Sequence, residues 1–334
     1  MKIALVTGGG GFVGKAIVKR LIERGIVCRV IGRHRYPEVA QLGAVCLQGD
    51  IRDYSFLRES FQGVDTVFHA AALAGIWGKW QDYHSINVQG TENVLNACRA
   101  QGISRLVYTS TPSVVFNRRD ITGGDESLPY AEKFLCHYAR SKVMAEKMVL
   151  AANDPTLLTC AIRPHLIWGP GDPHLIPRLL ASGRQRLLKK VGTGRNMVDI
   201  SYVDNVAYAH VLAADNLSGS RTAAGKAYFI NQGKAVCLWD WINALFAELA
   251  IPQITSAIPF PLAYCVGALS ELLYSCLRSN KEPRMTRFLA EQLAKAHYFS
   301  SARAKEDLGY TPIVSTEQGI KLLVKWIKTH EHTI

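Results

Sequence analysis

The sequence lacks the patterns that mark disulfide scaffolds, metal centres and secreted proteins. Its eight cysteines are scattered without a CxxC pair, which is typical of free thiols in a reducing compartment. The ten histidines include no HExxH motif, so no metal site is predicted. The chain opens directly on an apolar run and offers no secretion signal, so the expected location is the cytoplasm.

Nucleic-acid-binding modules are also missing, although the chain is basic. Lys and Arg number 39 against 27 acidic residues, a net charge of +12, yet no helix-turn-helix, zinc module or aromatic-basic platform accompanies this charge. The excess therefore favours anionic small molecules, such as a phosphorylated cofactor and an acidic substrate, over nucleic acid.

The opening stretch, MKIALVTGGGGFVG, predicts a strand, a tight turn and a helix. Glycines at such a turn let backbone N–H groups and a helix N-terminus approach a pyrophosphate that a Cβ would hold away. The candidate dinucleotide contacts in this turn are Gly8, Gly11, Phe12, Val13 and Gly14. Taken alone, the glycines leave a strand-helix turn that binds nothing as the less favoured alternative.

The second predicted strand, 27–31, ends in Gly32 and Arg33, where a dinucleotide fold meets the adenosine ribose. An acidic residue here would accept from the 2′-hydroxyl of NAD. Its absence favours NADP, with Arg33 as the phosphate partner, and leaves NAD as the alternative. A solvated basic loop would carry the same residues.

The next two predicted strands add further candidates. Asp50 and Ile51 follow the third strand, and Asp50 is placed to accept from an adenine amino group. Ala70 and Ala71 follow the fourth, where small side chains would let the cofactor pass close above the strand ends. The loop beyond carries Trp77 and is either a wall of a substrate pocket or plain packing.

Hydroxyl groups and a tyrosine-lysine pair supply the candidate chemistry. The strand 105–108 runs into a hydroxyl-rich stretch that contains Thr111 and Ser113, and open α/β sheets bind ligands at such strand ends. Tyr138 and Lys142 project from one face of a predicted helix. The ammonium, together with a nicotinamide cation nearby, should lower the pKa of the phenol from near 10, so that Tyr138 can exchange a proton with an alcohol oxygen. An isolated YxxxK is also common on solvated helix faces.

Regular alternation of strands and helices ends near residue 170. We therefore expect a dinucleotide-binding domain over 1–170 and a mainly substrate-binding region over 171–334, with later segments returning to the first sheet. Within the second region the segment 257–277 is apolar, with Glu271 as its sole acid and two early prolines that argue against a spanning helix. A buried helix, a lid over a long apolar substrate and an in-plane membrane contact are the three interpretations, in decreasing order.

The motifs in order resemble the extended short-chain dehydrogenase/reductase family, and within it the 3β-hydroxysteroid dehydrogenase-like branch. They are TGGGGFVG, the Gly49-Asp50 pair, HAAA at 69–72, NVQGT from Asn87, TST at 109–111, YxxxK from Tyr138, Arg163-Pro164 and DLGYTP. The resemblance covers nearly the whole chain. It implies a doubly wound α/β parallel sheet, the Rossmann fold, with a smaller C-terminal substrate-binding region.

The same resemblance implies the roles of the site residues. Tyr138 would be the proton donor, Lys142 would hold the nicotinamide ribose and tune Tyr138, and Thr111 would hydrogen-bond the substrate oxygen. The family more often has serine at the last position, so Ser110 or Ser113 could take that role instead. Family members also pair through helix bundles, and the segments 84–101 and 138–152 are the candidates for a homodimer here.

Within this branch, the sequence most resembles enzymes of two activities. One is NADPH-dependent reduction of the 3-oxo group of a long-chain 2-alkyl-3-oxoalkanoate in olefin synthesis, which the loop 74–95 and the missing acid after Gly32 favour. The alternative is NAD(P)-dependent oxidation of a 3β-hydroxysteroid or a sterol-4α-carboxylate. A non-catalytic dinucleotide sensor is the least favoured interpretation.

Both the oxoalkanoate and the sterol carboxylate carry a carboxylate β to the reacting oxygen. The resemblance implies that Pro164 and His165 lie beside the nicotinamide. Our hypothesis is that His165, together with Arg178, recognises the carboxylate. A histidine bonded to a backbone carbonyl is the alternative.

Overall fold

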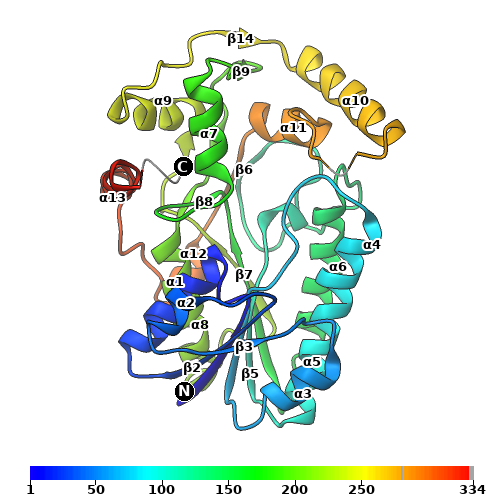
Figure 1. Ribbon diagram of the computed structural model, residues 1–334, viewed down its shortest axis with the longest axis vertical. Coiled ribbons are helices and arrows are strands. Elements are labelled where there is room, and N and C mark those ends of the chain that lie inside the picture. The colour runs from blue at the N-terminus through cyan, green and yellow to red at the C-terminus, as the bar shows by residue number, and fades with distance from the viewer. Residues whose placement is uncertain (280, 331–334) are drawn as a thin grey trace.

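Seven parallel strands form the central sheet (Figure 1). In the computed structural model, which describes residues 1–279 and 281–330, their order is β12-β7-β5-β4-β1-β2-β3. The strands are β1 (Ile3–Thr7), β2 (Val27–Gly32), β3 (Val45–Gln48), β4 (Thr66–His69), β5 (Arg105–Thr109), β7 (Leu158–Pro164) and β12 (Lys226–Ile230). Strand order reverses between β1 and β4, which opens a crevice at the carboxyl ends of these strands. The predicted doubly wound α/β fold is confirmed.

Helices cover both faces of this sheet, so most of its strand residues are buried. One face packs against α1 (Phe12–Glu23), α8 (Val203–Ser218) and α12 (Ala302–Leu308). The other packs against α3 (Tyr54–Ser60), α5 (Gly90–Ala100) and α6 (His137–Ala151). The shorter elements nearby are α2 (Pro37–Ala40), α4 (Trp80–Tyr83), the π-helical turn His84–Gln89 and the 3₁₀ turn Pro112–Val114. Because α8, α12 and β12 follow residue 170, the second half of the chain supplies part of this layer.

The remaining elements gather above the carboxyl ends of the strands (Figure 1). The helices are α7 (Leu175–Arg184), α9 (Leu238–Glu248), α10 (Phe260–Cys276), α11 (Arg287–Ala294) and α13 (Thr316–Thr329). One small sheet contains β6 (Ile121–Gly124), β10 (Met197–Val198), β13 (Val236–Cys237) and β15 (His297–Phe299). Two strand pairs join β8 (Ile167–Trp168) to β11 (Ser201–Tyr202) and β9 (Lys190–Val191) to β14 (Ala257–Ile258).

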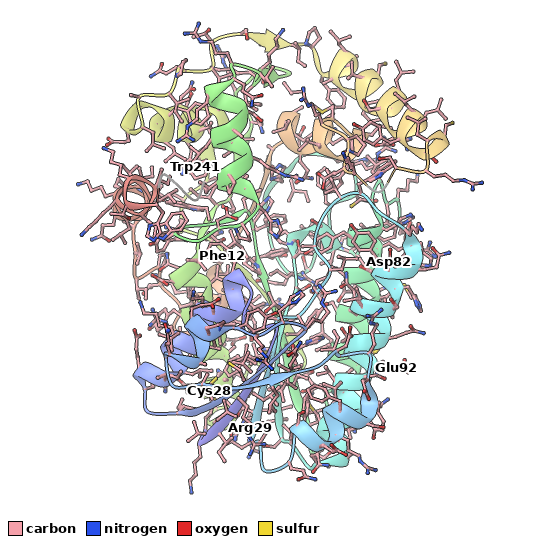
Figure 2. All side chains as sticks on the ribbon, in the orientation of Figure 1. Phe12, Cys28, Arg29, Asp82, Glu92 and Trp241 are labelled. Atoms are coloured by element: carbon pink, nitrogen blue, oxygen red, sulfur yellow. The ribbon has the colours of Figure 1, made fainter. Side chains whose placement is uncertain are left out.

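This upper region has its own hydrophobic core. Trp168 and Trp239 are fully buried there, and Trp241 lies in the same cluster among the side chains of the upper region (Figure 2). In the same view Phe12 marks the start of α1, below this core and above the sheet. The crevice therefore lies between two separately packed cores, where an open α/β fold binds its ligands.

The apolar segment 257–277 forms α10, and the buried-helix interpretation is wrong. Only Ala263 and Gly267 of this helix are buried, whereas Leu269 is 67% and Leu272 63% exposed. Hydropathy alone cannot report which face of a helix meets the core, because this helix is apolar nearly all round. No helix in the described part of the chain is long and apolar enough to cross a bilayer.

Candidate active site

The loop between β1 and α1 leaves no room for side chains. A Cβ at Gly8 would lie 2.8 Å from backbone atoms of Ala71, and one at Gly14 would collide with the carbonyl oxygen of Gly8. Helix α1 starts after Gly11, with no capping side chain and no acid in its first turn. Its first N–H groups and its partial positive charge are therefore available to a pyrophosphate. The cradle fits a dinucleotide.

A cavity of about 220 Å³ continues from this cradle. Seven predicted cofactor residues line it: Gly8, Gly11, Arg33, Asp50, Ile51, Ala70 and Ala71. The exposed Arg33 carries no carboxylate partner within the described chain, whereas Asp50 pairs with Arg52 at 2.7 Å. Hydrogen bonding from Arg52 lowers the pKa of Asp50, so this carboxylate is ionised and can still accept from an adenine amino group.

The other predicted cofactor residues do not line this cavity. Phe12, Val13 and Gly14 form the first turn of α1, while Pro164 ends β7 and His165 follows it. Tyr36 lines the cavity but was not predicted, since nothing in the local sequence distinguishes it from a surface loop residue.

Tyr138 and Lys142 lie in the first two turns of α6, and the hydroxyl of Thr111 approaches from the end of β5. Lys142 is 2% exposed; its Nζ donates to the carbonyl of Thr109 at 2.7 Å and lies 4.1 Å from the ring centroid of Tyr108. Burial lowers the pKa of Lys142 to about 7, partly offset by Glu146. The structure thus brings the three predicted catalytic side chains together, with Ser113 next to Thr111 at 3.2 Å between hydroxyl oxygens.

The acidity of Tyr138 differs from the expectation. Burial raises its pKa to about 12, and a hydrogen bond with Thr111 opposes that rise. Lys142 does not reverse it because its ammonium is itself desolvated and bonded to the Thr109 carbonyl. At neutral pH the phenol is therefore protonated, which is the state that a proton donor needs.

Asn87 was quoted only as part of a motif, yet it joins two parts of the site. It lies in the π-helical turn His84–Gln89, and its side chain bonds both the N–H and the carbonyl of Leu73. Its Nδ2 also donates to Ser141 Oγ at 2.9 Å, and Ser141 Oγ donates to the carbonyl of Tyr138. Asn87 therefore positions the catalytic helix against the loop after β4.

A buried ion pair anchors the other side of α6. Glu146, one turn beyond Lys142, accepts from Arg163 of β7 and, at 2.8 Å, from the hydroxyl of Tyr130. Both charged side chains are at most 4% exposed. Removing either partner would leave an uncompensated buried charge, so this pair holds α6 in register with the sheet.

His165 is neutral and held by a second histidine. The carbonyl of Gln292 accepts from His297 Nε2, so His297 Nδ1 is left to accept from His165 Nε2, at 2.6 Å. Burial and the neighbouring His297 hold the pKa of His165 well below its usual range. His165 thus presents an unprotonated Nδ1, which suits accepting a hydrogen bond better than binding a carboxylate.

Arg178 and Trp77 occupy different surroundings. Arg178, on α7, forms an ion pair with Glu282 at 2.8 Å, so a substrate carboxylate would have to displace that acid. Trp77 donates to the carbonyl of Ser279 and lines a cavity of about 1110 Å³ together with Cys136 and His137. Cys136 and His137 directly precede Tyr138, so the cavity adjoins the start of the catalytic helix α6.

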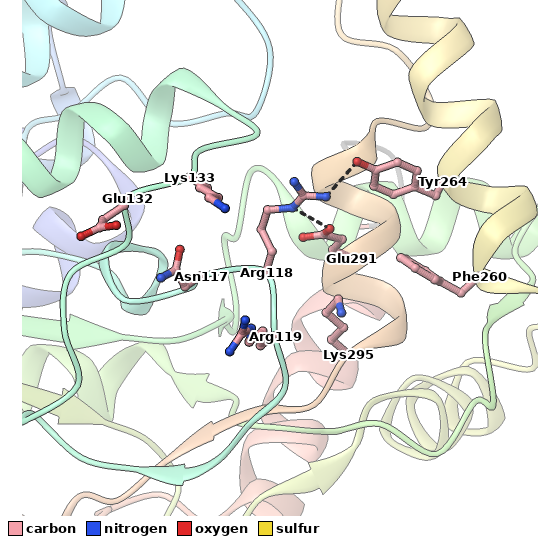
Figure 3. Close-up of a pocket in the computed structure, with 9 residues that line it drawn as sticks. All are labelled: Asn117, Arg118, Arg119, Glu132, Lys133, Phe260, Tyr264, Glu291 and Lys295. Atoms are coloured by element: carbon pink, nitrogen blue, oxygen red, sulfur yellow. Dashed lines mark hydrogen bonds and ion pairs between the residues drawn. The ribbon is translucent and has the colours of Figure 1, made fainter.

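A second cavity, of about 670 Å³, lies under α10 and is rich in cations (Figure 3). Arg118 is neutralised there by Glu291 at 3.0 Å and donates to the Tyr264 hydroxyl at 2.9 Å. The remaining cations on its walls are Arg119, Lys133 and Lys295. No ion pair joins any of these three to an acid over the residues that the structure covers.

Comparison with known proteins places the chain among dehydrogenases. The model of the 3-beta hydroxysteroid dehydrogenase/isomerase family matches residues 5–262. The 2-alkyl-3-oxoalkanoate reductase of Stenotrophomonas maltophilia is 48% identical over 325 residues, which cover 97% of this chain and 98% of that protein. The decarboxylating sterol-4-alpha-carboxylate 3-dehydrogenase of mouse is 35% identical and covers 97% of this chain and 90% of its own length.

Solved structures share the fold at lower identity. The dTDP-glucose 4,6-dehydratase DesIV of Streptomyces venezuelae, solved as a double mutant with NAD bound, superposes with a TM-score of 0.78 at 22% identity. The match covers 99% of this chain and 98% of that one.

Proposed function

Because the chain belongs to the 3-beta hydroxysteroid dehydrogenase/isomerase family, and is therefore an NAD(P)-dependent oxidoreductase of the short-chain dehydrogenase/reductase type, we propose that it reduces a long-chain 2-alkyl-3-oxoalkanoate with NADPH. The observation that carries the chemistry is the half-buried phenol of Tyr138, which is protonated at neutral pH and has the Thr111 hydroxyl beside it. Reduction consumes a proton at the carbonyl oxygen, and this phenol can deliver one. The reductive direction rests on the missing acid after Gly32, which favours NADPH. The 48% identity to a reductase of this name supports the substrate class.

Each residue has a defined task in this proposal. The nicotinamide, when bound, supplies the hydride that adds to the C3 carbonyl carbon. Tyr138 gives its proton to the carbonyl oxygen as the C=O bond becomes a C–OH bond, and Thr111 stabilises the developing alkoxide. Lys142 would hold the nicotinamide ribose, beside the Thr109 carbonyl that already accepts from its Nζ. Arg33, without an acid partner, binds the 2′-phosphate of NADPH.

We propose further that the cation-rich cavity of Figure 3 receives the substrate carboxylate. His165 is neutral and Arg178 is already paired, so other cations are better suited to this role. Part of the cavity wall comes from 117–119, which follow Thr111 in the chain, and from 132–133, which precede Tyr138. The rest comes from Phe260, Tyr264, Glu291 and Lys295. Lys133 and Lys295 are the candidate partners.

The deciding experiment measures the reaction in the oxidative direction. Purified protein is mixed with a synthetic 2-alkyl-3-hydroxyalkanoate and either NADP or NAD, and the absorbance of the reduced nicotinamide is followed. We expect turnover with NADP that falls roughly 10²–10⁴-fold in Tyr138→Phe while NADPH binding is kept. Turnover only with NAD and a 3β-hydroxysteroid or sterol acid would instead assign the alternative activity, oxidation of a 3β-hydroxyl group. NADPH binding without turnover on any of these substrates would instead support a non-catalytic role.

The carboxylate assignment has its own test. Lys133→Gln and Lys295→Gln should raise KM for the acid about tenfold without changing KM for its methyl ester. Arg178→Gln is the matched variant, and it should leave both values near those of the unmodified protein. A higher KM for the acid in Arg178→Gln, with no change in the two lysine variants, would assign the carboxylate site to Arg178.

A further inference from the structure

Helix α10 presents a continuous apolar face to solvent. Leu262, Val266, Leu269, Leu273 and Leu277 recur at helical spacing, and each is between 45% and 67% exposed. These five side chains are called the outer face of α10 below. A stripe of this kind is typical of a docking surface, since isolated exposed apolar side chains are common but five along one helix face are not.

The opposite face of α10 fixes the helix to the protein. A Cβ at Gly267 would lie 2.6 Å from the backbone of Thr286, so the helix packs closely on the start of α11. Glu271 accepts from both the N–H and the Nε of Arg287, each at 2.7 Å. The sole acid of the segment thus points inward, and the outer face carries no negative charge.

Exposed cations flank the outer face at both ends. Arg278, Lys281 and Arg284 follow the C-terminal end of α10. Arg184, Arg186 and Lys189 precede β9, which pairs with β14 immediately before the helix. Figure 1 shows β9, β14 and α10 along the same end of the molecule. Six cations therefore border one apolar stripe.

We propose that the outer face of α10 lies in the interfacial plane of a membrane that contains anionic lipids. The helix of 17 residues is about 26 Å long and carries its apolar face outward, as in-plane helices do. The flanking cations would bind lipid phosphates. A second copy of the chain suits this face less well, because an antiparallel pair would bring the cations of one copy against those of the other, and Glu282, the acid within 278–284, is already paired with Arg178.

This surface also bears on the proposed function, on which the following step rests. The inward side of α10 contributes Ala268, Glu271 and Tyr274 to the 1110 Å³ cavity that adjoins Tyr138. One helix thus separates the outer face from that cavity. A long-chain acid dissolved in the bilayer could enter the cavity beside α10 without crossing water.

Co-sedimentation of the full chain with vesicles tests the membrane contact. Phosphatidylcholine vesicles are compared with vesicles that also contain phosphatidylglycerol. We expect binding to the anionic vesicles that weakens with salt and falls about tenfold or more in a Leu269→Asp, Leu273→Asp double variant. The matched control is Ile313→Asp, Leu322→Asp, which changes two similarly exposed apolar residues elsewhere and should bind like the unmodified protein.

Retained NADPH binding and circular dichroism show that each variant is folded. Absence of vesicle binding by the unmodified protein would overturn the proposal, as would equal losses in both double variants. A self-association in analytical ultracentrifugation that Leu269→Asp, Leu273→Asp abolishes would assign the face to a second copy instead. Vesicle binding does not depend on turnover. The membrane contact can therefore be tested even if the chain proves not to be a reductase.

Discussion

At the level of single residues, Tyr36 explains why position 32 is glycine. A Cβ at Gly32 would collide with the ring of Tyr36 and lie 2.7 Å from its hydroxyl, and the same ring would collide with a Cβ at Gly10. The backbone carbonyl of Tyr36 caps the start of α2 by accepting from Val39 and Ala40 at 3.0 Å, which fixes its place. The ring therefore fills the space that an NAD-selecting acid would need.

Cofactor choice should thus depend on two residues jointly. Gly32→Asp alone should weaken NADPH binding about tenfold without creating NADH binding, because the new carboxylate cannot reach the ribose past Tyr36. Adding Tyr36→Ala should restore space and yield NADH binding. Fluorescence titration with both nucleotides measures this. If Gly32→Asp by itself bound NADH as tightly as the double variant, Tyr36 would have no role in selection.

Sequence predicts single residues well where the chemistry is local. Tyr138 and Lys142 share a helix, so their common face follows from spacing alone. The state of His165 depends on His297, 132 positions away, and that of Arg178 on Glu282. No local pattern contains such partners, so the sequence alone does not give the protonation state of His165 or the pairing of Arg178.

At the level of elements, the β1–α1 turn separates two kinds of glycine. A Cβ at Gly14 would collide with the carbonyl oxygen of Gly8, whereas one at Gly11, which lines the cofactor cavity, would lie 3.2 Å from the same oxygen. Gly14→Ala should cost roughly 1–3 kcal/mol of stability and also weaken NADPH binding, because the turn must move. Gly11→Ala should weaken binding with a smaller change in stability. Thermal unfolding and nucleotide titration compare them, and identical profiles would refute the distinction.

The π-helical turn provides a second test at this scale. Asn87→Ala would leave the backbone groups of Leu73 without their buried partner, at a cost of about 1–3 kcal/mol. We expect kcat to fall about tenfold while Asn87→Asp, which keeps the acceptor for the Leu73 N–H, recovers part of it. Urea unfolding and steady-state rates measure the two effects. Full activity in Asn87→Ala would show that the turn does not position α6.

The sequence predicts which segments form helices and strands better than it predicts which of them are buried. The glycine turn and the alternating strands predict the Rossmann layer because period and turn chemistry are local. For α10 the sequence favours a buried helix over an interfacial one, since the two can share one composition, and the structure shows the helix exposed.

At the level of the whole molecule, buried histidines tie stability to pH. Burial lowers the pKa of His69 to about 3 and that of His210 to about 4, and it also lowers those of His165 and His297. In the unfolded chain these rings take up protons near pH 6.5, so the unfolded state binds more protons below that pH. Stability should therefore fall as pH drops from about 6.5 toward 4.

Urea midpoints at about pH 7 and pH 5 measure this fall. Glu126, Asp172, Asp199 and Asp204 act in the opposite direction because burial raises their pKa values, that of Asp199 to about 6. The histidine effect should prevail between pH 7 and 5, because the unfolded rings titrate near pH 6.5, inside that interval. In His210→Gln the difference between the two midpoints should shrink. Equal midpoints in the unmodified protein would show that the rings protonate without unfolding.

The position of β12 sets the order in which the protein can be made. This strand pairs only with β7, yet β7 ends at Pro164 and β12 begins at Lys226. At roughly 5–20 residues per second, a ribosome needs on the order of 3–13 seconds to synthesise the intervening chain. Throughout that interval β7 is an apolar edge that other nascent chains can pair with. Slow translation through this stretch should therefore favour aggregation over correct folding.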